Sequence, residues 1–247
     1  MSISRRKFLG WLGAAGFGTT LGNTARAASN KHFDGYPNSN GVLFDNTRCI
    51  GCRKCEEGCN RVNELPEPER PFSDLSLLDT KRRTTAKSYT VVNRYDDAVS
   101  EKGPLYSKFQ CNHCLEPACA SACFVRAFTK TKTGAVIYDA SVCVGCRYCM
   151  MACPYKARSF IHEPLTDQLP VAPHGKGTVE SCTLCVHRVD EGGTPACVEA
   201  CKAENHNAMF FGDLYDENSE ISQQLEQHGG KQQQPGDRLA KKRLRSV

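Results

Sequence analysis

The sequence predicts a small α+β fold with a pseudo-twofold repeat: two similar units of short hairpins and helices, joined by irregular loops. Three observations predict it. The 247 residues include 16 cysteines but only one tryptophan and 11 phenylalanines. The cysteines form four groups of similar spacing, and short strand-like segments lie between the groups. With so few large apolar side chains, whatever the cysteines bind must supply much of the folding free energy.

The four groups account for every cysteine, and the first and third have identical spacing. Numbered along the chain, the groups are Cys49, Cys52, Cys55 and Cys59; Cys111, Cys114, Cys119 and Cys123; Cys143, Cys146, Cys149 and Cys153; and Cys182, Cys185, Cys197 and Cys201. We expect groups one and two to form one unit of the repeat and groups three and four the other.

The spacing within a group has a physical reason. Three thiolates separated by two residues can lie on one tight loop and converge on three corners of a cubane. We expect the fourth cysteine, three residues further on, to start a helix that points away and so to reach a neighbouring cluster. The run C-x2-C-x2-C-x3-C, followed by proline as at Pro154, is typical of bacterial ferredoxins. Four such groups predict four [4Fe–4S] clusters in tandem ferredoxin-like units.

Two other uses of the cysteines were weighed. An even number of cysteines in an exported chain commonly forms disulfides, but triplets spaced by two residues cannot all be bridged locally. Zinc needs C-x2-C pairs that meet other pairs, and triplets fit that pattern poorly. A disulfide- or zinc-stabilised binding module is therefore an alternative with weaker support.

Two segments outside the groups have strand composition. Residues 89–95 are rich in β-branched and aromatic side chains, and residues 133–138 read as a turn that enters a strand. The segment 223–247 is rich in glutamine and ends in basic residues, which predicts a polar, mobile tail. The four-cluster domain is accordingly expected to span residues 42–222.

The first 27 residues have the features of an export signal. Arg5 and Arg6 precede Phe8 and Leu9, a short apolar stretch follows, and residues 25–27 read Ala-Arg-Ala. Paired arginines followed by Phe-Leu match the twin-arginine signal, a route that moves folded proteins. We expect cleavage after Ala27 and a periplasmic protein. The alternative is a first helix of the domain, which the many glycines of this stretch disfavour.

Charge and hydropathy favour neither a nucleic-acid-binding protein nor a membrane-spanning one. The formal net charge is +5, of which four positive charges belong to residues 1–27. A [4Fe–4S] cluster with four thiolates carries about −2, so many lysines and arginines are expected to balance this buried charge. This balance gives no support to nucleic-acid binding. No apolar run reaches the roughly 18 residues that a membrane span needs.

On these motifs the chain resembles the four-cluster iron–sulfur subunits of respiratory oxidoreductases, such as polysulfide, tetrathionate and dimethyl sulfoxide reductases, formate-dependent nitrite reduction and a periplasmic hydrogenase. The resemblance covers about residues 42–222 and is most specific at residues 143–155 (CVGCRYCMMACPY) and 182–201 (CTLCVHRVDEGGTPACVEAC). Residues 212–214 and 216–219, together with the export signal, are similar to the periplasmic subunit of the membrane complex associated with dissimilatory sulfite reduction.

The resemblance implies which cysteines share a cluster. The implied sets are Cys49, Cys52, Cys55 and Cys201 for cluster 1; Cys59, Cys182, Cys185 and Cys197 for cluster 2; Cys111, Cys114, Cys119 and Cys153 for cluster 3; and Cys123, Cys143, Cys146 and Cys149 for cluster 4.

The resemblance also implies a role. It predicts an electron carrier without a catalytic site of its own, peripheral to the inner membrane. Its expected partners are an integral-membrane, quinone-reactive subunit of polysulfide-reductase type and, on the other side, a cytochrome c or another redox subunit. A free-standing periplasmic polyferredoxin is the alternative.

Four further side chains near the groups have two interpretations each. His113 and His187 can be imagined as ligands, but four thiolates already complete each site, so hydrogen bonding near a cluster or to the backbone is expected. Tyr148 and Tyr155 flank group three and can shield a cluster from water, although simple packing explains them equally well.

Overall fold

The computed structural model describes residues 40–96, 103–162 and 177–227. The chain divides into two compact units, residues 1–32 and 33–247, and the first lies outside the described residues. The expected export signal and most of the expected tail also lie outside them. The described chain begins with strand β1 (Asn40–Phe44), and helix α7 (Glu220–Gln227) continues across the expected domain boundary at residue 222.

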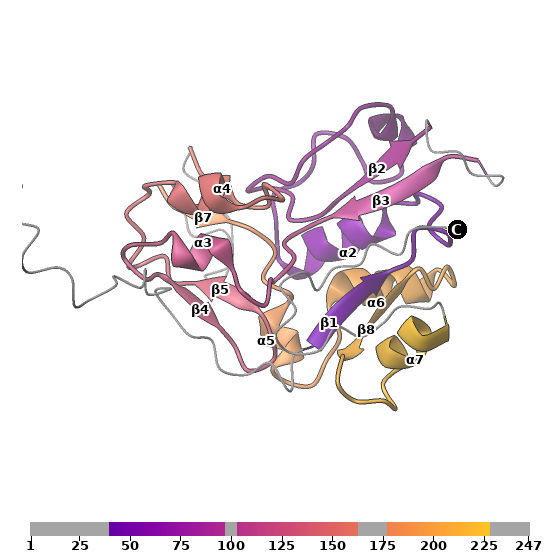
Figure 1. The fold of residues 1–247 in the computed structure, drawn as a ribbon. Coiled ribbons are helices and arrows are strands. Elements are labelled where there is room, and N and C mark those ends of the chain that lie inside the picture. The colour runs from indigo at the N-terminus through magenta and orange to yellow at the C-terminus, as the bar shows by residue number, and fades with distance from the viewer. Residues whose placement is uncertain (1–39, 97–102, 163–176, 228–247) are drawn as a thin grey trace, which may run out of the picture. The chain divides into compact units, whose positions relative to one another are not determined.

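The fold is α+β, as the cysteine pattern predicts. Four two-stranded antiparallel sheets alternate with short helices (Figure 1). Strand β1 pairs with β8 (Met209–Asp213), β2 (Val91–Tyr95) with β3 (Leu105–Phe109), β4 (Phe128–Lys130) with β5 (Val136–Tyr138), and β6 (Ser159–Phe160) with β7 (Val179–Glu180). Strands β2 and β5 confirm the two segments predicted from composition.

The helices are short. They are α2 (Lys54–Val62), α3 (Ala118–Ser121), α4 (Tyr148–Ala152), α5 (Val186–Val189), α6 (Ala196–Ala203) and α7, with a 3₁₀ turn η2 (Leu75–Asp79). Four of them, α2, α3, α4 and α6, carry cysteines of the groups. No helix in the described ranges is both long and apolar enough to cross a membrane.

The start of these helices corrects one expectation. The fourth cysteine does not begin the helix: α2 begins at Lys54 and carries both Cys55 and Cys59, and α4 begins at Tyr148 and ends before Cys153. Arg53 and Arg147, each with a φ above +60°, turn the chain out of the loop just before the third cysteine. Cys55 and Cys59 are therefore separated by one helical turn and lie on one face of α2, whereas Cys153 directly follows the end of α4.

The packing of the helices corrects a second expectation. Helix α2 of group one packs against α6 of group four, and α3 of group two packs against α4 of group three. At the α2–α6 crossing, a Cβ added to Gly58 would lie 2.8 Å from the Cβ of Ala200, so small residues permit the close approach. The repeat therefore consists of a one–four module (cysteine groups one and four) and a two–three module (groups two and three).

Each module has its own apolar core. In the one–four module, Val198 and Met209 pack with Val42 and Phe44. In the two–three module, the core contains Ala120, Ala127, Phe128, Val136 and Val179. Cysteines take part in both cores, because their helices carry few other apolar side chains.

A buried ion-pair network ties the group-one loop to strand β2. The Glu56 carboxylate is almost fully buried and lies 3.1 Å from Nη2 of Arg53 and 2.6 Å from Nη2 of Arg82. It also accepts a hydrogen bond from the backbone N–H of Val92 at 2.7 Å. Two guanidinium groups and a backbone donor satisfy this carboxylate, as a buried charge requires.

Candidate metal centres

Each cysteine group lies on a loop with the same backbone turn. The residue directly before the second cysteine has a positive φ in all four groups: +75° at Gly51, +43° at His113, +68° at Gly145 and +59° at Leu184. Such turns make concave nests of backbone N–H groups, which favour anions and occur at iron–sulfur sites. In group four, the N–H of Leu184 donates to Sγ of Cys182 at 3.4 Å.

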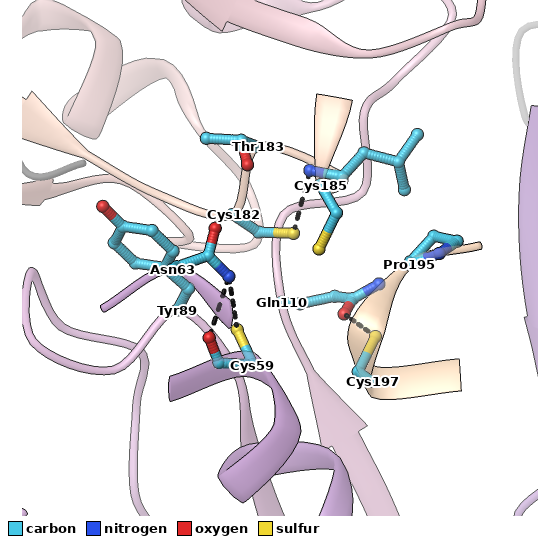
Figure 2. A pocket seen from close by; sticks show the side chains of 10 residues that line it. Cys59, Asn63, Tyr89, Gln110, Cys182, Thr183, Cys185, Pro195 and Cys197 are labelled. Atoms are coloured by element: carbon cyan, nitrogen blue, oxygen red, sulfur yellow. Dashed lines mark hydrogen bonds between the residues drawn. The ribbon is translucent and has the colours of Figure 1, made fainter. Parts of the chain in front are cut away.

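Cysteines from two distant groups line one pocket. Cys59 reaches it from α2 of group one, and Cys182, Cys185 and Cys197 reach it from group four (Figure 2). Side chains beside the sulfurs donate to them or accept from them. Nδ2 of Asn63 lies 3.6 Å from Sγ of Cys59, and Oε1 of Gln110 lies 4.0 Å from Sγ of Cys197. The structure thus brings together the four residues of the expected second set.

The remaining cysteines of the one–four module also lie close together. Cys49 and Cys55 pack against the apolar core that contains Cys197 and Cys201. The thiol of Cys49 interacts electrostatically with those of Cys52 and Cys201, which connects group one with the last cysteine of group four.

The two–three module shows the same exchange between groups. The Cys119 thiol interacts with those of Cys111 and Cys153. The Cys149 thiol interacts with those of Cys143 and Cys123, and also with Cys119. The structure places Cys114 near Cys111, where both influence the ammonium of Lys130. Cys146, the remaining residue of the expected fourth set, is exposed at the surface.

Burial makes these thiols poor acids unless a metal replaces the proton. It raises the pKa of Cys49 and of Cys149 to about 11. Burial also raises the pKa of Cys55, Cys59 and Cys182, and the nearby thiols add to this effect. Thiolates in such surroundings are stable only beside positive charge, which bound iron supplies as it displaces the protons.

The sulfurs of the described residues do not converge on points for single metal ions. Across residues 40–96, 103–162 and 177–227, no three His, Cys, Asp or Glu side chains converge as a single metal ion requires. A single zinc ion draws its sulfurs to about 2.3 Å from one point, whereas a four-iron cubane spreads them around its corners. The nest-forming loops, the thiol-lined pocket and the donor set fit [4Fe–4S] clusters.

Several side chains that lie near the cysteine groups could not be identified from the cysteine motifs. Lys130 donates hydrogen bonds to the carbonyls of His113, Cys114 and Gly134, at 3.1, 3.2 and 2.7 Å. It thereby fixes the group-two loop. Burial lowers the pKa of its ammonium to about 8, against the opposite influence of Cys114 and Cys111. Lys130, Asn63 and Gln110 stand outside the cysteine motifs, so only the fold reveals their role.

The expected role of His113 agrees with the structure. Its Nδ1 accepts a hydrogen bond from the backbone N–H of Val136 at 2.9 Å. This bond joins the group-two loop to β5. The two tyrosines of group three, Tyr148 and Tyr155, are both exposed.

The region that contains the cysteine groups is similar to known iron–sulfur proteins. A family model described as a 4Fe-4S dicluster domain matches residues 104–214. A protein of Nitratidesulfovibrio vulgaris is 52% identical over 85% of this chain and 54% of its own length. The Hydrogenase-2 operon protein HybA of Escherichia coli O157:H7 is 37% identical over 71% of this chain and 52% of its own length. The chain spans about half the length of these two relatives.

A third relative matches almost end to end. The Hdr-like menaquinol oxidoreductase iron-sulfur subunit 1 of Archaeoglobus fulgidus is 34% identical over 92% of this chain and 91% of its own length. The chain belongs to the family of [4Fe–4S] electron-transfer subunits of oxidoreductases. Its 16 cysteines in four groups are the ligand complement of four [4Fe–4S] clusters.

Proposed function

We propose that the chain is a periplasmic subunit that relays electrons through its four clusters, between a membrane quinone-reactive subunit and another redox subunit of a respiratory complex of sulfur metabolism. The pocket that joins Cys59 of group one to Cys182, Cys185 and Cys197 of group four carries this proposal. It places two different cysteine groups around one site, as a continuous row of closely spaced clusters requires. When bound, each cluster accepts and returns one electron.

The proposed ligand sets are those that the resemblance implies. They pair group one with group four and group two with group three. The packing of α2 on α6 and of α3 on α4 supports them, as do the thiol contacts of Cys49 with Cys201 and of Cys119 with Cys153. Within each module, the last cysteine of one group crosses to the triplet of the other.

The surface around group three supports a protein partner at cluster 4. Exposed apolar side chains gather in the sequence around Cys146, which is itself exposed. They are Val142, Val144, Tyr148, Met151 and Tyr155, here called the group-three surface. Met151 is 85% exposed. Apolar side chains beside an exposed ligand suit a redox partner that covers the site and excludes water.

Disrupting this surface is expected to release the membrane partner. In the double variant Val144→Glu/Met151→Glu, two carboxylates would lose hydration on docking, which opposes association. Gentle detergent extraction should co-purify wild-type chain with a multi-span subunit, and a quinol analogue should reduce some clusters of that complex. The variant should keep its iron but lose both properties.

Leu75→Glu, at an exposed apolar position on η2, is the matched control and should behave as wild type. If the wild-type chain washes off the membrane in buffer alone, with no membrane subunit, the free-standing polyferredoxin replaces this proposal.

The more specific assignment, to the subunit of the sulfite-reduction complex, rests on the expected export signal together with the resemblance of residues 212–214 and 216–219. In the structure, Ser219 and Ser222 both hydrogen-bond to the backbone carbonyl of Asp213, at 2.6 and 3.4 Å. These bonds fold the segment between β8 and α7 into a compact turn against the one–four module.

Export by the twin-arginine route is tested by conservative substitution. Arg5→Lys/Arg6→Lys keeps the charge but removes the guanidinium pair, so we expect cluster-loaded precursor to accumulate inside the cell. Arg26→Lys is the control and should be exported normally. Cell fractionation and N-terminal sequencing give the result, with the mature chain expected to begin at Ala28. Normal export of the double variant would exclude this route.

A further inference from the structure

Arg158 is a buried cation next to a cysteine sulfur. The residue follows group three in the chain and directly precedes β6, and it is 4% exposed. Nη1 donates to Oγ of Ser181 at 2.6 Å, and the guanidinium lies 4.7 Å from the centre of the Phe128 ring. In the described part of the chain no ion pair includes Arg158, whereas Arg53 and Arg82 share Glu56.

A buried guanidinium without a counter-charge is costly, so the identity of its neighbours matters. Nη2 of Arg158 lies 3.8 Å from Sγ of Cys119. Burial acts to lower the pKa of Arg158, but the thiols of Cys111, Cys119 and Cys149 outweigh it and raise the pKa. Cys111 and Cys119 belong to the proposed cluster 3, and Cys149 belongs to cluster 4. The guanidinium thus faces both sites of the two–three module.

Lys108 has the corresponding place in the one–four module. It lies on β3, and its ammonium donates to Oε1 of Gln110, the oxygen that also lies beside Sγ of Cys197. Its ammonium interacts with sulfurs of both proposed sets. They are Cys197, Cys182 and Cys59 of cluster 2, and Cys55 of cluster 1. The Lys108 side chain also forms no ion pair with a carboxylate among the described residues.

We propose that each module uses one shared cation to set the reduction potentials of its two clusters: Arg158 for clusters 3 and 4, and Lys108 for clusters 1 and 2. The inference rests on the proposed ligand sets. Reduction adds one negative charge to a cluster, and a fixed cation in the poorly screened interior stabilises the reduced form. Each cation therefore raises the potential of two clusters together, which keeps neighbouring steps of the row close in energy.

Redox titration of the full-length chain tests the proposal, with dithionite supplying one electron to each cluster and EPR spectra reporting the reduced clusters. Arg158→Met should shift two of the four midpoint potentials downward and leave two unchanged. Lys108→Met should lower the other two. The charge-conserving variants Arg158→Lys and Lys108→Arg should retain most of the wild-type potentials. Lys132→Met, at an exposed position, should change none.

Iron analysis separates this inference from the function on which it rests. Wild-type chain with about 16 iron atoms supports four clusters, and about half that number would overturn the proposed function. Full iron content with unshifted potentials in both Met variants would overturn the shared-cation inference. So would equal shifts in the Met and charge-conserving variants. If Arg158→Met loses iron, Arg158→Gln, which keeps donors toward Ser181, takes its place and must lower the same two potentials.

Discussion

Cys59→Ala is expected to remove the cluster of the group-four triplet and to leave the cluster of its own triplet in place. Iron should fall from about 16 to about 12 atoms per chain. The reason is that Cys59 lies on α2, beyond the loop of its own group, and lines a pocket with Cys182, Cys185 and Cys197. Without it, three buried thiolates would share a cluster with an open iron corner. Anaerobic iron and sulfide analysis with EPR measures the loss.

Cys201→Ala is the matched control for crossed ligation. It lies one helical turn after Cys197 on α6, and its thiol interacts with Cys52. This variant should therefore lose the cluster of Cys49, Cys52 and Cys55. The two variants should remove different EPR signals of the one–four module. Loss of the same signal in both, or a crystal structure with Cys59 on its own triplet's cluster, would contradict the assignment.

Gly145→Ala is expected to be the most damaging change that leaves every ligand intact. Gly145 has a φ of +68°, and a Cβ there would lie 2.5 Å from the carbonyl oxygen of Gly177. The left-handed backbone alone costs an alanine about 1–2 kcal/mol, and the collision is with backbone that cannot rotate away. We expect a loss of stability above ~2 kcal/mol and selective loss of iron from the group-three site, because this turn forms its nest.

Gly192→Ala separates the cost of the left-handed backbone from the cost of the collision with Gly177. Gly192 has a φ of +83°, but a Cβ there meets no atom within 4 Å. This variant should show the backbone cost alone and keep all its iron. Anaerobic thermal unfolding and iron analysis of both variants give the comparison. Equal effects would show that the contact with Gly177 does not matter.

The cysteine spacing alone determined the fold class and the cofactor, because each group is a local device. Three sulfurs on one loop, such as Cys143, Cys146 and Cys149, need only a few residues of backbone to converge. The strand at Val91–Tyr95 was likewise evident from its β-branched and aromatic side chains. These features depend on near neighbours in the chain, which a sequence displays directly.

The ligand sets implied by the resemblance already paired group one with group four and group two with group three, but only the tertiary structure showed which helices pack together and where each helix begins. The repeat suggested that neighbouring groups belong together, but α2 lies against α6, where Gly58 and Ala200 permit close approach. It also decided which cations serve the clusters. Arg158 and Lys108 lie outside the cysteine motifs, and nothing near them in sequence distinguishes them from other basic residues. Their role arises because folding buries their charges beside sulfurs from distant groups, and a buried charge must find its counter-charge in space rather than along the chain.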